Sequence, residues 1–172
     1  FHLTLQLWPY MVPLAVVYFA EYALQSGVWA AMGFPVQNEE ARKEFYEFAN
    51  WTYQAGVVVA RSSGKWWTPT RLKLWLVPLL QIIFLGFSIA NAYYQWWYDW
   101  SIMLLCFCVG LCGGLVYIGG FNLITIEMDD SVRELSLSTA SMADSVGIMC
   151  ANVAGIFIQK ALYRHYGFAD EN

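Results

Sequence analysis

The sequence predicts an all-α membrane protein, a polytopic helical bundle with about five transmembrane helices. Hydrophobic residues make up 59% of the 172 residues and charged residues only 13%, about half the share of about 25% found in soluble domains. The mean hydropathy is +0.44. Five long apolar stretches are separated by short polar connections, and none shows the alternation of a β-strand. Backbone groups in lipid must pair within the protein, so a helical bundle follows.

The first two spans differ in how apolar they are. The first is predicted at about residues 8–32, with Pro9 and Pro13 near its start, and the residues Pro35 and Asn38 end it. The second is predicted at about residues 45–60. It is short for a bilayer crossing, which takes about 20 residues. A polar lead over residues 39–44 extends it as a helix.

The remaining three spans are predicted at about residues 74–92, 100–126 and 137–162. Between the third and fourth spans stands an aromatic cluster typical of a membrane interface, formed by Trp96, Trp97, Tyr98 and Trp100. The fourth connection is predicted over residues 127–134, and the chain finishes in the polar tail GFADEN.

The orientation in the membrane follows from the basic residues of one segment. Between the second and third spans, residues 61–73 contain no acidic residue and four basic ones: Arg61, Lys65, Arg71 and Lys73. Basic connections face the cytosol, so this segment is predicted to be cytosolic. The first and third connections and the tail then lie on the lumenal or external side. The fourth connection would be cytosolic although it is acidic, because acidic residues count little in this rule.

Small residues recur every four positions in the last two spans. The fourth span has Cys106, Gly110 and Gly114, and the fifth has Ala143, Gly147, Ala151 and Gly155. Membrane helices associate through small residues that let their backbones approach closely. These positions are therefore predicted helix-packing sites. A moving seam in a transporter would give the same pattern.

A carboxylate lies in the middle of the first span, in the stretch VYFAEYALQSGVW. An ionisable side chain at that depth costs at least about 2.5–3.5 kcal/mol, so Glu21 is expected to face a partner, a cavity or a pathway. Tyr18 and Gln25 stand three residues before and four after it, on the same helical face, and both could donate hydrogen bonds to it. Buried carboxylic acids tend to hold a proton, which suits a proton-carrying site. The alternative is a hydrogen-bond cluster that only fixes helix packing.

Two further groups of polar residues complete the candidate site. In the second span, Asn50, Gln54 and Arg61 lie on one stripe, with Tyr53 beside it. Arg61 could instead be an interface anchor. In the fifth span, Asp144 lies about 12 Å from the interface at 1.5 Å per residue, and Asn152 follows two turns later. Asp144 could belong to a cavity or cap a neighbouring helix.

Several functional classes lack support in the sequence. It contains no glycine-rich phosphate loop, no nucleophile elbow and no His-rich metal motif, and its two histidines stand near the two ends. The four cysteines lie in apolar runs, which is typical of packing residues. The net charge is −4 and no basic stripe is present. We therefore expect no enzyme activity, no metal, no cofactor and no nucleic-acid partner.

Four strings in the sequence resemble the C-terminal half of the battenin family: VPLAVVYFAEYALQSGVW, YQAGVVVARSS, GGLVYIGGFNLI and MADSVGI. The resemblance covers nearly the whole chain. The family is similar to the major facilitator superfamily, in which two helical bundles flank a central cavity. The resemblance implies that this chain is the second bundle, embedded in a lipid bilayer, and that an N-terminal half is its partner.

The resemblance also implies a function. Family members are lysosomal or vacuolar multi-pass proteins associated with lumenal pH homeostasis, basic amino acid handling and glycerophosphodiester export. Glu21 falls on the Glu of YFAEY, Arg61 on the Arg of ARSS and Asp144 on the Asp of MADSVGI. A transporter would use Glu21 for a proton or a cationic group, Arg61 at a gate or for an anionic substrate, and Asp144 in the cavity. The alternative is a membrane scaffold or trafficking factor without transport, and the substrate stays open.

Overall fold

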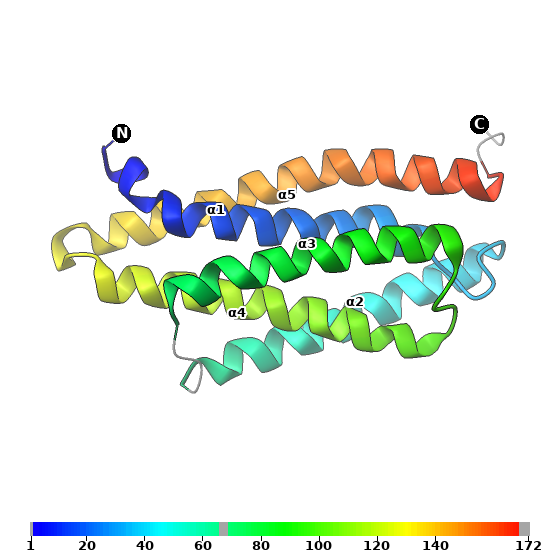
Figure 1. The fold of residues 1–172 in the computed structure, drawn as a ribbon, viewed down its shortest axis with the longest axis horizontal. Coiled ribbons are helices and arrows are strands. Elements are labelled where there is room, and N and C mark those ends of the chain that lie inside the picture. The colour runs from blue at the N-terminus through cyan, green and yellow to red at the C-terminus, as the bar shows by residue number, and fades with distance from the viewer. Residues whose placement is uncertain (1, 66–68, 169–172) are drawn as a thin grey trace.

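The computed structural model describes residues 2–65 and 69–168, and these are almost entirely helical (Figure 1). The five long helices are α1 (His2–Ala23), α2 (Glu39–Ser62), α3 (Arg71–Tyr94), α4 (Met103–Glu127) and α5 (Asp130–Tyr166). The first helix continues through a π-helical segment, η1 (Leu24–Val28), and a 3-10 turn, η2 (Trp29–Ala31). Two more 3-10 turns are η3 (Ser63–Lys65) and η4 (Trp100–Ile102). The all-α prediction is confirmed.

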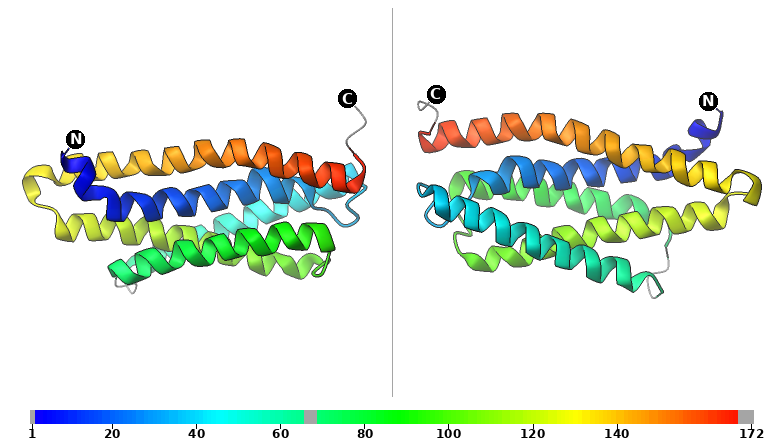
Figure 2. Two further views of the ribbon diagram at one scale, coloured as in Figure 1. Left: turned by 45° about the horizontal axis from the view of Figure 1, so that its top comes forward. Right: turned by 180° about the vertical axis from the view of Figure 1, so that it is seen from behind.

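The helices run side by side along the long axis of the molecule (Figures 1 and 2). The start of α1, the end of α2, the start of α3 and the connection from α4 to α5 lie at one end. The end of α5 and the connections from α1 to α2 and from α3 to α4 lie at the other end (Figure 1). The chain therefore traverses the bundle five times in alternating directions.

Four of the helical segments are long and apolar enough to cross a membrane: Gln6–Ala31, Arg71–Tyr94, Trp100–Glu127 and Asp130–Tyr166. Helix α2 is not among them, because charged and amide side chains are distributed along it from Glu39 to Arg61. Its 24 residues still extend about 36 Å at 1.5 Å per residue, more than the about 30 Å of a hydrocarbon core. A crossing by α2 stays a prediction.

The predicted connection over residues 127–134 is wrong, whereas the bounds of the last span stay a prediction. Helix α5 begins at Asp130, so the connection that was predicted over residues 127–134 is only Met128 and Asp129. Acidic side chains are favourable in a first helical turn, and Arg133 pairs with Asp130 at 2.5 Å one turn later. At its other end, Gly167 closes the helix in the left-handed conformation, with φ at 81°. Residues 169–172 of the predicted tail, and residues 66–68 of the basic segment, lie outside the described residues.

The buried apolar side chains form two clusters along the bundle. One includes Leu7 and Leu14 from the first half of α1, and the other includes Trp29 and Phe45 near the connection from α1 to α2. Tyr22 packs against both clusters. The middle of the first span, where the predicted carboxylate lies, is therefore the junction between the two apolar cores.

A polar cluster joins three helices at the end where α1 starts. Arg71 pairs with Glu127 at 2.5 Å, and the buried Tyr10 hydroxyl donates a hydrogen bond to the same carboxylate. Arg71 is the first residue of α3 and Glu127 the last of α4, and each charge is unfavourable at that end of its own helix. The contact between helices therefore compensates both charges and ties α1 to α3 and α4.

Removing the Tyr10 hydroxyl is expected to weaken this cluster. Tyr10→Phe keeps the ring but leaves Glu127 without its buried donor, so the free energy of unfolding should fall by about 1 kcal/mol. Thermal unfolding of the full-length protein in micelles measures the effect. Tyr94→Phe, at an exposed ring on α3, is the matched control and should change nothing. Equal shifts for both variants would contradict the assignment.

Candidate intramembrane site

The carboxylate of Glu21 is enclosed between three helices. Its side chain is 1% exposed, and Tyr53 of α2 donates a hydrogen bond to Oε2 at 3.1 Å. Oε1 has no hydrogen-bond partner among the described residues. This oxygen lies against Gly113 of α4, where an added Cβ would overlap it. Glu21 therefore ties α1 to both α2 and α4 while one of its oxygens stays unsatisfied.

The hydrogen-bond donor is not one of the two that helical spacing suggested. Tyr18 and Gln25 were the expected donors, but the hydrogen bond comes from Tyr53. The Gln25 amide nitrogen is buried and has no partner among the described residues. The chain leaves α-helical geometry at Leu24, so the spacing of an ordinary helix no longer applies to Gln25. Such π-helical segments occur frequently at functional sites.

The other two predicted charges act on the same part of α1. The Arg61 guanidinium lies 4.3 Å from the centre of the Tyr117 ring, a cation–π contact. Its positive charge also acts on Glu21 and Tyr18. The half-buried Asp144 acts electrostatically on Tyr18 and accepts hydrogen bonds from the Ser145 amide at 2.6 Å and hydroxyl at 3.3 Å. Glu21, Arg61 and Asp144 thus make separate contacts, with Tyr53, Tyr117 and Ser145 respectively, and form no ion pair with one another.

The three predicted amides lie apart from Glu21, on the outside of α2 and α5. Asn50 donates to the Tyr46 carbonyl at 2.8 Å, and Gln54 is exposed beside it in a groove of about 280 Å³. Asn152 is exposed on α5. Together with Asp144 they are the set of polar residues on α2 and α5 that we call the polar face, and apolar side chains such as Val58 and Met149 are exposed among them. Figure 2, seen from behind, shows α2 and α5 on the two sides of α1.

Helix α3 presents a different outer surface. Its exposed side chains through the middle of the helix are apolar: Leu72, Leu76, Leu79, Leu80, Ile82, Ile83 and Phe87. Such a surface suits lipid tails. Exposed amides and a carboxylate at comparable depth on α2 and α5 would be costly against lipid. The polar face is therefore a candidate for contact with water or with another part of the protein.

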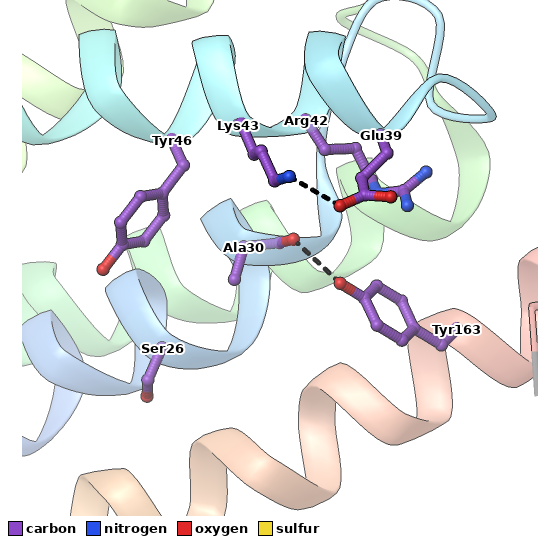
Figure 3. A pocket seen from close by; sticks show the side chains of 7 residues that line it. All are labelled: Ser26, Ala30, Glu39, Arg42, Lys43, Tyr46 and Tyr163. Carbon is purple, nitrogen blue, oxygen red and sulfur yellow. Dashed lines mark hydrogen bonds and ion pairs between the residues drawn. The ribbon is translucent and has the colours of Figure 1, made fainter. Parts of the chain in front are cut away.

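A cavity of about 430 Å³ lies between the start of α2, the segment Ser26–Ala30 and the end of α5 (Figure 3). Tyr163 donates to the Ala30 carbonyl at 3.3 Å on one side of the cavity, and Lys43 pairs with Glu39 at 2.6 Å on the other. The hydrogen bond and charge of Lys43 lower the pKa of Glu39 below its usual value. With Arg42 also in the lining, the cationic groups outnumber the carboxylate two to one. The volume lies within the usual range for small-molecule sites.

The predicted helix-packing residues lie at two helix–helix contacts. Gly110 and Gly114 of α4 face α2, and Gly147 and Gly155 of α5 face α1 and η1. Ala151 is fully buried on the same side of α5. Among the described residues, no group of three His, Cys, Asp or Glu side chains could hold a metal ion.

Gln81 is one of the buried polar side chains that escaped the sequence argument, as did Ser88 and Asn91. Gln81 of α3 is completely buried; its amide nitrogen donates to the Val109 carbonyl at 3.5 Å, and its oxygen has no partner among the described residues. The signal was present, because Gln81 is the one amide in the apolar run from Leu74 to Phe87. A lone amide in such a run marks a contact between helices.

A double-mutant cycle tests the contact between Glu21 and Gly113. Gly113→Ala is expected to destabilise the protein by about 1–2 kcal/mol, because the new methyl group must displace the buried carboxylate from Tyr53. In a Glu21→Ala background the space is vacated, and the same change should be neutral or stabilising, since alanine is a better helix former than glycine. Thermal unfolding of the four full-length proteins gives the coupling, and additive effects would show that the two residues do not touch.

Comparison with known proteins gives a consistent set of relatives. The sequence model of the CLN3 protein family matches residues 2–165. Protein BTN1 of Kluyveromyces lactis is 35% identical over 160 residues, which is 91% of this chain and 41% of the relative. Protein BTN1 of Saccharomyces cerevisiae is 30% identical over 172 residues (92% and 41%), and battenin of Canis lupus familiaris is 31% identical over 152 residues (87% and 34%). The chain thus spans about two-fifths of the length of these BTN1 proteins. No solved structure was found to match it.

Proposed function

Because this chain belongs to the CLN3 protein family, we propose that it is one half of a lysosomal or vacuolar membrane transporter. The observation that carries the proposal is that α2 and α5 carry amides and the half-buried Asp144 among their exposed apolar side chains, whereas the exposed side chains in the middle of α3 are all apolar. A bundle surrounded only by lipid has no use for exposed amides at membrane depth. The polar face would line a water-filled cavity, and the rest of the protein would form the opposite wall.

Within this transporter, Glu21 is the proton-carrying group. In the conformation described here its carboxylate is sealed against Gly113, away from the polar face. Only one oxygen is hydrogen-bonded, so a shift of α1 that gives Oε1 a water or substrate partner is favourable. Arg61 lies against Tyr117 and Asp144 is half-buried on α5, so both charges are available to act in the cavity that the proposed opening of Glu21 would reach.

The proposed substrate is a small anion. We place the segment 61–73 on the cytosolic side, which puts the cavity containing Arg42 and Lys43 on the lumenal side. Because Lys43 is paired with Glu39, Arg42 is the charge left over in the lining, and this net positive charge favours an anionic solute over a cationic one. Of the activities expected from the family resemblance, export of glycerophosphodiesters fits this charge better than handling of basic amino acids.

Counterflow in reconstituted vesicles tests the proposal. Full-length protein that contains this chain is placed in liposomes loaded with unlabelled solute, and entry of the labelled solute is followed. A labelled glycerophosphodiester should accumulate transiently, whereas labelled lysine should not. Accumulation of lysine alone would overturn the substrate assignment. Absence of counterflow for both solutes would favour a non-transporting scaffold.

A further inference from the structure

Helices α2 and α4 touch through their backbones. A Cβ on Gly110 would overlap the carbonyl oxygen of Tyr53, and one on Gly56 would overlap the carbonyl oxygen of Phe107. One turn further along α4, a Cβ on Gly114 would come within 2.6 Å of the Ala60 methyl group. Three glycines therefore hold these two helices at a separation that excludes side chains.

Helices α1 and α5 form a second contact of the same kind. A Cβ on Gly147 would overlap the carbonyl oxygen of Ala15. Further along, Gly27 and Gly155 face each other, and a Cβ on Gly27 would lie 3.1 Å from the Gly155 Cα. The bundle thus contains two glycine-packed pairs, α1–α5 and α2–α4.

The contacts between the two pairs are made by side chains and not by backbone atoms. The glycines of α4 that face α1 meet side chains: Gly113 meets the Glu21 carboxylate, and a Cβ on Gly120 would lie at an ordinary 3.6 Å from the Leu14 side chain. The polar links across the boundary are side-chain hydrogen bonds, from Tyr53 to Glu21 and from Tyr10 to Glu127. Side-chain contacts can re-form through new rotamers, whereas interlocked backbones must separate before they can slide.

We infer that α1–α5 and α2–α4 each move as a rigid pair, and that the bundle rearranges along the boundary between them. In the present conformation, the contacts of Glu21 with Tyr53 and Gly113 hold the two pairs together. The inference rests on the proposed transport function, which requires motion, and it specifies where within this half that motion occurs. A displacement of one pair by about 1–2 Å is typical of packed helices that shift in conformational switches. Such a shift would free the Glu21 carboxylate from Gly113 while leaving both glycine contacts intact.

Distance measurements by electron paramagnetic resonance test the inference on the full-length protein, with its native cysteines replaced. Spin labels go on exposed positions: Val58 with Leu104 within one pair, Val12 with Met149 within the other, and Val58 with Met149 across the boundary. Distances are compared at acidic and neutral pH, with and without a glycerophosphodiester. The cross-boundary distance should change by about 1–2 Å, while both within-pair distances stay constant.

Two results would overturn the inference. A within-pair distance that changes as much as the cross-boundary distance shows that the pairs are not rigid. An unchanged cross-boundary distance shows that the two pairs do not move relative to each other, whether or not the protein transports the solute. Counterflow measured on the same labelled protein is a separate readout: flux with constant distances leaves the proposed function standing, and loss of all flux contradicts that function.

Discussion

Glu21→Gln is expected to lower flux through the full-length protein at least about tenfold and to remove its pH dependence, while the fold is retained. Glutamine has nearly the same size as glutamate, and its carbonyl oxygen can still accept the hydrogen bond from Tyr53. It cannot bind or release a proton. Initial rates of glycerophosphodiester uptake into proteoliposomes, measured over a series of pH values, give the result.

The control for this change is a carboxylate that is exposed and lies outside the site. Glu134→Gln, on the surface of α5, removes the same charge and should leave the rate and its pH dependence unchanged. Thermal unfolding of both variants shows whether the fold is retained. A Glu21→Gln protein that keeps the normal pH profile would end the proton-carrying role and leave Glu21 as a packing residue.

Gly110→Ala is expected to destabilise the protein by about 2 kcal/mol or more. In an ordinary helix the same change would stabilise the protein, because alanine is a better helix former than glycine. The new methyl group would overlap the Tyr53 carbonyl, which is backbone and cannot rotate away. The α2–α4 pair would have to separate along its length. Thermal unfolding of purified full-length protein in micelles, followed by intrinsic fluorescence, measures the effect.

Gly86→Ala is the matched control within the same bundle. Gly86 is exposed on α3 and an added Cβ would meet nothing within 4 Å. The change should be neutral or stabilise the protein by up to about 1 kcal/mol, as expected for alanine in an exposed helix. Similar effects at both glycines would show that the close approach of α2 and α4 does not contribute to stability.

Sequence spacing indicated which residues share a face of a helix, but not which other helix that face contacts. The recurrence of small residues indicated one side of α4 and of α5, because a four-residue period follows from helix geometry, and in the structure those glycines lie against neighbouring helices. It did not indicate that Gly110 faces α2 or that Gly147 faces α1. For the same reason Tyr53 was not recognised as the donor to Glu21. That contact depends on how separate helices pack, and no local pattern records it.

Two local features of the backbone, the start of α5 and the π-helical segment, could not be predicted from the sequence. The residues before Leu137 are polar enough to suggest a loop, yet acidic residues and an Asp130–Arg133 pair support a helix there. The π-helical segment at Leu24–Val28 has no recognisable sequence signal and changes the direction of Gln25. Both departures come from backbone geometry at helix ends or interruptions, where hydrophobic periodicity carries little information.

The central claim is that the polar face of α2 and α5 lines an aqueous cavity while α3 faces lipid. Thiol labelling of full-length protein, in vesicles and with native cysteines replaced, tests it directly. Cysteines at Gln54 and Asn152 should react with a water-soluble, membrane-impermeant reagent, and a cysteine at Ile83, which is also exposed but lies on α3, should not. Labelling at Ile83 with protection of both Gln54 and Asn152 would contradict the account.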